Sequence, residues 1–428
     1  MLSTNDPYPL MRTIVDLHIH SKYARACSPL LTPQNLAVWA DKKGIGILGT
    51  GDFTHPKWME DLAVLTEMEE GLYGIKGHTV RFMYTAEIAS IYKQGDKLRR
   101  VHNLVFAPSR EIAQKFNAAL EGRGANLKSD GRPITGIHSD ELVRIAKDIH
   151  TDMQVVPAHA WTPHFGVFGS LSGFNSLEEA YGEEAKHIWA IETGLSSDPA
   201  MNWQVQNLDN ITLISNSDPH SLHRLGREAN VLDIDPKKLS YREIIRTFKD
   251  HNPTEFLYTI EFFPEEGRYH LDGHRDCKFS CLPEKTKELG GVCPVCGKQL
   301  LRGVQYRVED LASRPLGFHP ESAVPFRNLL SLEEVISQAL NVGVGSKKVQ
   351  GLYERMVGHT KEFDILLDLS EAEIVLLSDS TVAAAVIRMR EGTFHIQPGY
   401  DGEYGKVELY TEAEWEALDK RPKQVGLF

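Results

Sequence analysis

Short apolar runs alternate with helical stretches over roughly the first 250 residues of the chain. Helical spacing over 32–43 and 139–150 separates apolar runs that have the length of buried strands. Repeated alternation of strand and helix is typical of a parallel sheet or barrel, so the pattern predicts an α/β fold with about seven such units. The predicted strands are 13–20, 45–50, 80–87, 101–106, 153–159, 187–192 and 211–215.

Ionisable side chains recur where these runs end. Asp16, His18 and His20 close the first run, and Asp218 and His220 follow the last one. In a parallel barrel the carboxyl ends of the strands converge on one mouth, so these side chains are expected to meet there. Other runs end at or near Asp52, Glu87, His159 and Glu192.

The spacing of the first and last of these motifs favours a metal site. Residues two apart on a strand share a face, so His18 and His20 can bind one ion, and Asp218 and His220 repeat the geometry. Mixed nitrogen and oxygen ligands suit Zn, Mn, Fe or Mg, and the sequence does not choose among them. A histidine taken singly, such as His102, is more often a hydrogen-bonded or surface residue than a ligand.

Composition and charge exclude several classes of protein. The chain has 428 residues, of which 41% are hydrophobic and 25% charged, which excludes collagen, coiled coil and wholesale disorder. The net charge of −12 excludes an evenly basic surface but not a local basic patch. No apolar run is long enough for a membrane span, and residues 1–12 lack the pattern of a signal peptide, so we expect a cytoplasmic protein.

Four of the five cysteines are clustered. Cys277, Cys281, Cys293 and Cys296 have the spacing of a zinc ribbon, and four thiolates in a reducing compartment fit one structural Zn. The alternative, a redox pair of Cys293 and Cys296, is disfavoured because two further cysteines lie close upstream and no thioredoxin-like pattern surrounds them.

The front-half motifs resemble those of the polymerase-and-histidinol-phosphatase (PHP) family. Asp16-Leu17-His18-Ile19-His20-Ser21 looks like its first motif, Gly51-Asp52-Phe53-Thr54-His55 like its second, and Ser217-Asp218-Pro219-His220 like its last. The resemblance covers about residues 12–250. It implies a distorted (β/α)₇ barrel that holds Zn, Mg or Mn ions and hydrolyses phosphoesters, with the metals polarising the ester and activating water.

The resemblance also implies a ligand set. His18, His20, Glu87, Asp218 and His220 are the expected catalytic residues, and Asp16 is expected to orient a ligating imidazole. Phe53 and Cys27 stand where the family often has histidine, and we interpret Cys27 as a small buried residue. For Glu192 and His164 two roles are open: their side chains either face the metal site at the mouth of the barrel or only support the barrel. The implied metal ligands are His18, His20, Asp52, His55, Glu87, His102, His159, Asp218 and His220.

Two features of the rear half point to DNA and to a partner protein. Residues 341–349 join helical patterns over 331–340 and 347–357 and resemble a helix–hairpin–helix loop, in which Gly343 and Gly345 let backbone amides approach a phosphate and Lys347 and Lys348 add charge. A plain helical hairpin is the alternative. The tail residues Gln424, Leu427 and Phe428 resemble the peptide that docks on the bacterial sliding clamp, with a chance match as the alternative.

The order of these modules resembles the endonuclease Q family. The resemblance implies a nucleoid-associated enzyme that nicks DNA on the 5′ side of deaminated bases (uracil, hypoxanthine, xanthine) and at abasic sites, with the lesion base flipped into a pocket. Four aromatic residues after the fifth predicted strand either line that pocket or belong to the hydrophobic core: Trp161, Phe165, Phe168 and Phe174. The expected modules are a barrel over 1–262, a four-cysteine zinc module over 263–314, a helical or α+β DNA-binding domain over 315–420 and a clamp-binding tail over 421–428.

Two other functions are compatible with parts of this pattern. A phosphatase acting on a small phosphomonoester would need the barrel but has little use for the rear modules. A non-catalytic DNA-binding protein that uses its metals structurally would need the rear modules but not the nearly complete ligand set.

Overall fold

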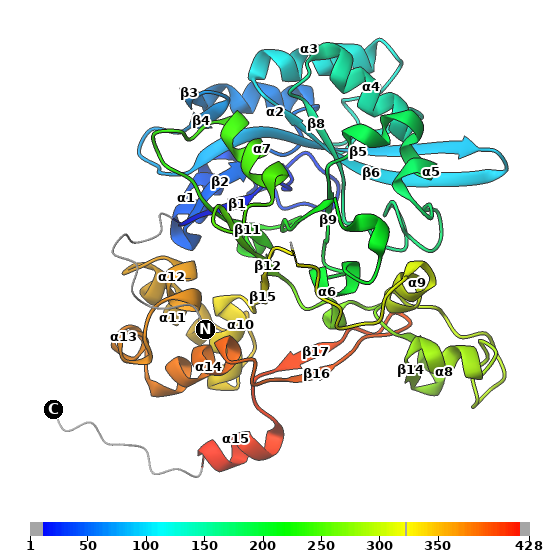
Figure 1. Ribbon diagram of the computed structural model, residues 1–428. Helices are drawn as coiled ribbons and strands as arrows, with labels where there is room; N and C mark the ends of the chain where they lie inside the picture. Colours follow the sequence, from blue (N-terminus) through cyan, green and yellow to red (C-terminus); the bar gives the residue numbers. More distant parts are fainter. Residues whose placement is uncertain (1–11, 322, 420–428) are drawn as a thin grey trace.

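The computed structural model describes residues 12–321 and 323–419 (Figure 1). The predicted clamp-binding residues Gln424, Leu427 and Phe428 lie outside these ranges. Within them, no helix has the length and apolar character needed to cross a membrane.

All the strands predicted for the front half are present. β1, β2 and β5 pair in parallel, as do β9 and β10. Their bounds are β1 (Arg12–Asp16), β2 (Ile45–Gly49), β5 (Arg81–Gln94), β6 (Lys97–Ala107), β8 (Gln154–Pro157), β9 (Ala190–Glu192) and β10 (Thr212–Ile214).

The expectation of a parallel sheet is wrong at β6. β6 pairs antiparallel with β5 along its whole length, and also antiparallel with β8. Only Gly95 and Asp96 separate β5 from β6, and a parallel crossover needs a dozen or more residues, so the two strands must form a hairpin. This long hairpin extends away from the rest of the front half in Figure 1.

The described strands of the front half belong to two separate sheets. The larger sheet has the order β15-β12-β11-β1-β2-β5-β4-β3, with β6 and β7 on β5 and β8 on β6, whereas β9 and β10 form their own ladder. β11 and β12 pair antiparallel beside β1 and were not predicted. The remaining strands of the larger sheet are β3 (Thr66–Glu69), β4 (Leu72–Gly74), β7 (Ile134–Thr135), β11 (Ala229–Asp233), β12 (Phe256–Glu261) and β15 (Phe326–Asn328).

The helices of the front half cover the outside of the strands. The predicted first helix begins after Thr32, whose side chain accepts a hydrogen bond from the amide of Asn35, and ends at Gly44, which is left-handed at φ 89°. The helices are α1 (Pro33–Lys43), α2 (Pro56–Asp61), α3 (Arg110–Glu121), α4 (Ser139–Ile149), α5 (Leu177–Tyr181), α6 (Pro199–Asn202) and α7 (Tyr241–Asp250). Short 3₁₀ turns are η1 (Leu62–Val64), η2 (Gly182–His187), η3 (Gln206–Leu208) and η4 (Leu222–Arg224).

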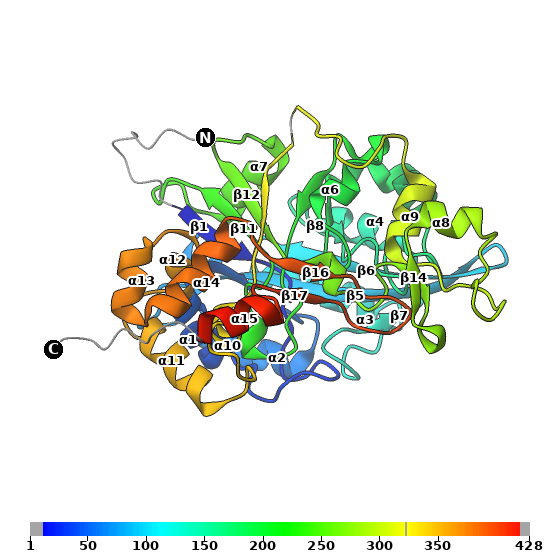
Figure 2. The same ribbon diagram turned by 90° about the horizontal axis from the view of Figure 1, so that it is seen from below.

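The rear half contains the cysteine cluster and a group of helices. In Figures 1 and 2 the β16–β17 hairpin crosses the underside of the molecule from these helices toward the cysteine segment. The elements of the cysteine segment are η5 (Pro264–Glu266), β13 (Asp272–His274), η6 (Arg275–Cys277), β14 (Phe279–Cys281), α8 (Pro283–Glu288) and α9 (Val304–Leu311). The later elements are α10 (Leu332–Leu340), α11 (Lys347–Val357), α12 (Glu362–Leu367), α13 (Glu371–Leu377), α14 (Ser380–Arg390), β16 (His395–Gln397), β17 (Lys406–Glu408) and α15 (Glu412–Asp419).

The rear helices are docked directly on the front half. Lys43 of α1 and Glu362 of α12 form a buried ion pair at 2.8 Å, and Arg12 of β1 pairs with Asp368. β15 adds itself in parallel to β12, so the sheet of the front half includes a strand from the rear half.

Candidate active site

Two groups of potential metal ligands lie at the strand ends. In the first group, atoms of His18, His20 and Asp218 lie within 4.8 Å of one another, and in the second so do atoms of Glu87, His102 and His159. The sequence predicted all six as ligands, and the structure brings them together from distant parts of the chain.

The carboxylate of Glu87 lies between the two groups. Its Oε2 is 3.4 Å from Nε2 of His20 and 3.6 Å from Nε2 of His18, while its Oε1 is 3.1 Å from Nε2 of His159. One carboxylate therefore faces both groups, an arrangement suited to bridging two cations.

The unpaired atoms at this site fit divalent cations. Nε2 of His18 and Nδ1 of His159 are buried without a hydrogen-bond partner, and Nε2 of His20 and Oδ1 of Asp218 have only each other, at 2.9 Å. Buried polar atoms are almost always hydrogen-bonded, so this set of atoms indicates missing partners. Imidazole nitrogens and carboxylate oxygens are the donors that Zn and Mn accept.

The protonation of His102 also suits a ligand. Burial lowers the pKa of His102 to about 4, against the raising effect of Glu87. The ring is therefore neutral near pH 7, as a metal-binding imidazole must be. Burial raises the pKa of the Glu87 carboxyl, but His102, Arg132 and His18 outweigh burial and hold that pKa well below its ordinary value.

Two carboxylates orient the histidines of the first group from behind. Oδ1 of Asp52 lies 3.1 Å from Nδ1 of His20, and a carboxylate oxygen of Glu192 lies 3.0 Å from Nδ1 of His18. Such contacts fix the tautomer and direction of a ligating ring. Asp52 was predicted as a ligand. The structure places its carboxylate against the far nitrogen of His20 and the backbone of Ser21, outside the two ligand groups, and its role as a ligand stays a prediction.

His55 and His220 lie outside the two ligand groups. The His55 ring stacks on Tyr23 at 4.6 Å between centroids, and its Nδ1 is buried without a hydrogen-bond partner, so its role as a ligand stays a prediction. The His220 ring lies 5.3 Å from that of His20 and borders the cavity in front of Asp218. His220 is thus beside the first group without belonging to it.

The Asp16 carboxylate forms hydrogen bonds with the segment that contains Ser217 and Gly226, and not with a histidine ring. The carboxylate accepts hydrogen bonds from the backbone and hydroxyl of Ser217 and from the backbone of Gly226, at 2.5–3.1 Å. The prediction that it orients a ligating histidine is therefore wrong. Burial raises the pKa of Asp16 to about 6. Its contacts position Ser217, and with it the neighbouring candidate ligand Asp218.

Several residues of the site have left-handed backbone conformations. Asp52, His159 and Asp218 have φ values of 44°, 31° and 42°, and the nearby Phe165 has φ 68°. Such conformations are strained for residues other than glycine and gather at functional sites.

The site opens into two adjoining cavities that share Thr162, Leu195, Ser196 and Asp218. The smaller, of about 530 Å³, is bordered by Arg132, His159 and Phe165. The larger, of about 760 Å³, is bordered by His220, Arg227, Arg268, Val344 and Tyr404, among others.

The aromatic residues after β8 divide into one surface residue and three core residues. Phe165 borders the smaller cavity, and its ring lies 4.3 Å from that of His102. Trp161, Phe168 and Phe174 are at most 2% exposed, so for these three the core interpretation is correct. Trp161 also donates its indole N–H to Asn202 at 2.7 Å.

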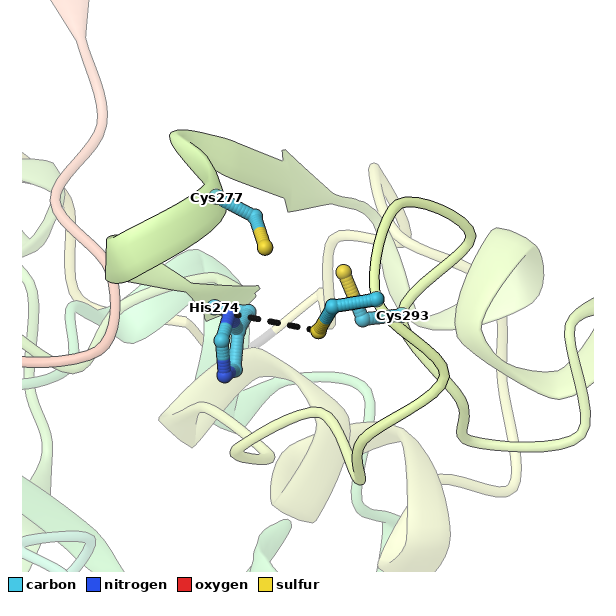
Figure 3. A group of neighbouring side chains, drawn as sticks. His274, Cys277 and Cys293 are labelled. Carbon is cyan, nitrogen blue, oxygen red and sulfur yellow. Dashed lines mark hydrogen bonds between the residues drawn. The ribbon is translucent and has the colours of Figure 1, made fainter.

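The cysteine cluster contains a histidine in place of one predicted cysteine. The metal-ligating atoms of His274, Cys277, Cys293 and Cys296 lie within 4.8 Å of one another, with Nδ1 of His274 3.9 Å from Sγ of Cys296. The side chains in Figure 3 point toward one another. Three thiolates and one imidazole are an established ligand set for structural Zn.

Cys281 lies outside this cluster because of the register of the β13–β14 hairpin. His274 pairs with Phe279 next to the turn, whereas Cys281 pairs with Asp272, two residues farther along. Two residues of strand correspond to about 6.6 Å. The Cys281 thiol instead lies 3.3 Å from the Thr286 hydroxyl in α8. This corrects the prediction of Cys281 as a ligand.

The glycine loop between α10 and α11 faces the larger cavity. Both helices have the predicted positions, and Val344 of the loop borders the same cavity as Asp218. Gly343 and Gly345 are exposed, and a Cβ at either would meet no atom within 4 Å. Lys347 and Lys348 are exposed at the first turn of α11.

Known proteins match both the whole chain and its rear part. A family model described as the MJ0043 C-terminal domain matches residues 331–393. The crystal structure of the lesion-specific endonuclease PfuEndoQ from Pyrococcus furiosus superposes with a TM-score of 0.83 and 30% identity, covering 96% of this chain and 100% of that one. This chain belongs to the endonuclease Q family.

A second endonuclease Q structure superposes equally well. It is a complex with a 27-mer duplex substrate that carries an abasic lesion at the active site, and it matches with a TM-score of 0.82 and 30% identity over 98% of this chain and 100% of that one. An uncharacterized protein from Methanocaldococcus jannaschii, MJ0043, is 31% identical over 264 residues, or 60% of this chain. This chain spans 32% of the length of that relative.

Sequence reasoning missed two arginines of this endonuclease Q site. Nη1 of Arg132 lies 3.1 Å from Glu87, and Arg227 donates to the backbone carbonyls of Ser217 and Asp218 at 2.7 and 2.9 Å. Both border the cavities. Arg132 follows an irregular loop and Arg227 precedes β11, so no periodic pattern marked either one.

Proposed function

We propose that this protein is a DNA repair endonuclease that hydrolyses the phosphodiester on the 5′ side of deaminated bases and abasic sites. The observation that carries the proposal is the position of Glu87 between two ligand groups whose members Asp218, His102 and His159 border adjoining cavities. The larger cavity is also bordered by the glycine loop, which suits a polyanion more than a small ester. The names of both matched structures, a lesion-specific endonuclease and an abasic-DNA complex, agree with it.

The two ligand groups would hold the divalent metals. When bound, such ions polarise a phosphodiester and supply a nucleophile at neutral pH. Glu192 and Asp52 keep the rings of His18 and His20 in their binding directions. Arg132 keeps Glu87 ionised and borders the smaller cavity, where its guanidinium is placed to offset charge that develops on a phosphate.

Phe165 is placed to stack on a flipped base. Its ring borders the smaller cavity, and its strained backbone at φ 68° holds a bulky side chain next to His102. An extruded base loses its neighbours in the helix and is stabilised by a new stacking partner. We therefore place the lesion nucleotide in the Phe165 cavity.

The loop before α11 is placed to contact the DNA backbone. Exposed glycines at 343 and 345 leave the amides open to a phosphate, and Lys347 and Lys348 add positive charge at the helix N-terminus. Docking on a sliding clamp through Gln424, Leu427 and Phe428 stays a separate prediction.

A nicking assay tests the proposed function. Labelled duplexes with one uracil, one hypoxanthine, one abasic site or no lesion are incubated with Mg or Mn. We expect one cut, immediately 5′ of the lesion, and none in the intact duplex. Hydrolysis of a small phosphomonoester without any nick would favour a phosphatase instead, and DNA binding without hydrolysis would favour a non-catalytic role.

A further inference from the structure

An arginine lies between two tyrosines on the wall of the larger cavity. The Arg268 guanidinium is 5.2 Å from the ring centre of Tyr269 and 5.6 Å from that of Tyr404. It also donates to both phenol oxygens, at 3.2 and 3.5 Å. All three residues border the cavity that contains Asp218, and Tyr404 is 70% exposed. A large exposed aromatic ring in a polar cavity indicates a ligand.

The chain segments that carry these side chains are fixed to each other. The loop between β16 and β17 donates backbone hydrogen bonds from Gly399, Gly402 and Gly405 to the carbonyls of Glu265, Arg268 and Glu266, at 2.8–3.1 Å. The approach is so close that a Cβ at Gly405 would lie 2.0 Å from the Glu265 oxygen. The two tyrosines and the arginine are therefore positioned before any ligand arrives.

The charges around Arg268 favour a phosphate-bearing ligand. Within the described part of the chain its guanidinium forms no ion pair, and Arg224 and Arg227 border the same cavity. Among the acidic neighbours, burial together with Glu334 and Glu265 raises the pKa of Glu266 to about 8, so this carboxyl is largely neutral at pH 7.

Two other acidic side chains that border the larger cavity, Glu333 and Glu334, have partners of their own. Glu333 accepts hydrogen bonds from Gln350 and contacts His223 at 3.0 Å, and Glu334 caps the first turn of α10 through Ser331. The positive charge of Arg268 is consequently available to a ligand that combines an anion with a flat ring.

We propose that Arg268, Tyr269 and Tyr404 form a stacking platform for an unstacked nucleobase of the bound DNA, with Arg268 contacting the adjacent phosphate. The inference deepens the proposed function and rests on it. Stacking on aromatic side chains is the usual way to hold a base that has left the helix, and arginine adds cation–π attraction and charge. Because the lesion nucleotide is placed on Phe165 in the smaller cavity, the platform in the larger cavity is placed to take the base of a nucleotide beside the lesion.

Binding of DNA to platform variants tests the proposal. Dissociation constants are measured by fluorescence anisotropy for uracil and abasic duplexes, with the Asp218→Ala substitution in every protein so that no cleavage intervenes. We expect Tyr404→Ala to raise Kd about tenfold, within the effect of removing one stacking aromatic, and Tyr404→Phe to change it less than about twofold. Phe318→Ala is the matched control.

Phe318 is a suitable control because it is also an exposed aromatic ring beneath an arginine. Its ring centre lies 4.1 Å from the Arg314 guanidinium, and it borders neither cavity within the described residues. Arg314 is already paired with Asp209. Phe318→Ala is expected to leave Kd unchanged.

The two duplexes distinguish the source of the base. A loss with the uracil duplex alone would put the lesion base on Tyr404, because the abasic duplex lacks that base, and would overturn the assignment of the platform to a neighbouring nucleotide. An equal loss with both duplexes identifies a neighbouring base. If Tyr404→Ala binds both duplexes as tightly as its Asp218→Ala parent, the platform is refuted. The absence of any nick by the unmodified protein would instead refute the proposed function.

Discussion

Glu192 and His18 are joined by a buried contact of 3.0 Å between a carboxylate oxygen and Nδ1 of the imidazole. The same carboxylate accepts the backbone N–H of His159 at 2.8 Å. One residue therefore positions a member of each ligand group, although it belongs to neither.

Replacing Glu192 with glutamine is expected to weaken metal binding more than catalysis. The amide keeps the shape but loses the charge that makes His18 a better donor, and such losses cost about 10–100-fold in metal affinity. Nicking rates measured against metal concentration should show a half-maximal concentration raised by that factor, with the rate largely restored in excess metal. An unchanged metal dependence would contradict this role.

Asp218→Ala is expected to abolish cleavage and to leave DNA affinity within about threefold of the original. Asp218 belongs to the first ligand group but is only one of many residues that border the cavities. Cleavage and Kd are measured on the same uracil duplex. Asp130→Asn removes a carboxylate from the smaller cavity without touching either ligand group and should retain cleavage. Parallel losses of binding and cleavage would count against the assignment.

The predicted structural zinc site allows a direct comparison of two cysteines. Cys277→Ser and His274→Ala should each lower the zinc content by one ion per chain, because both residues belong to the cluster. Cys281→Ser should bind as much zinc as the unmodified protein, since its thiol contacts Thr286. Zinc is measured by atomic absorption after dialysis. Loss of zinc from Cys281→Ser would restore the four-cysteine assignment.

The raised pKa of the buried Glu261 carboxyl leads us to expect that the free energy of unfolding falls as the pH rises. Burial, aided by Asp198, raises its pKa from 4.5 to about 8, against hydrogen bonds from Thr259, Thr193 and Ser215 that lower it. Between those two values the unfolded chain has lost this proton and the folded chain has kept it. Folding must then take up a proton, so stability is full below about pH 4.5 and decreases up to about pH 8.

Thermal unfolding measures this effect. Between pH 5 and pH 8 the Tm of Glu261→Gln should fall by less than that of the unmodified protein, with a difference of about 2 °C or more, which corresponds to roughly 1 kcal/mol in a domain of this size. Glu121→Gln, at an exposed position on α3, should follow the unmodified protein. Identical slopes for all three proteins would show that Glu261 is ionised in the folded state.

Local patterns were sufficient for the strands and for several of the candidate ligands. Strand length and alternation depend on neighbouring residues, and the ends of strands meet at one mouth, so His18, His20 and Asp218 could be grouped from the pattern, whereas Glu87 was added by the resemblance to the PHP family. The helices on either side of the glycine loop followed from their periodicity for the same reason.

Features that depend on strand register or on contacts between distant residues could not be predicted from local sequence patterns. The cysteine spacing marked the cysteine cluster, but the pairing of β13 with β14 places His274 rather than Cys281 in it. Arg132 meets Glu87 only because an irregular loop folds back over β5. The antiparallel orientation of β6, by contrast, could have been predicted from the sequence. Only Gly95 and Asp96 connect it to β5, and a connection of two residues is too short for a parallel crossover.

The pairing of β15 with β12 has a consequence for how the protein is made. The sheet that carries the active site gains this strand only after the zinc segment has left the ribosome, because residues 262–325 lie between the two strands. Until then the edge of β12 is an open template for pairing with other chains. A nuclease fragment ending at residue 262 should therefore aggregate, and production of a smaller catalytic version must begin by closing or charging that edge.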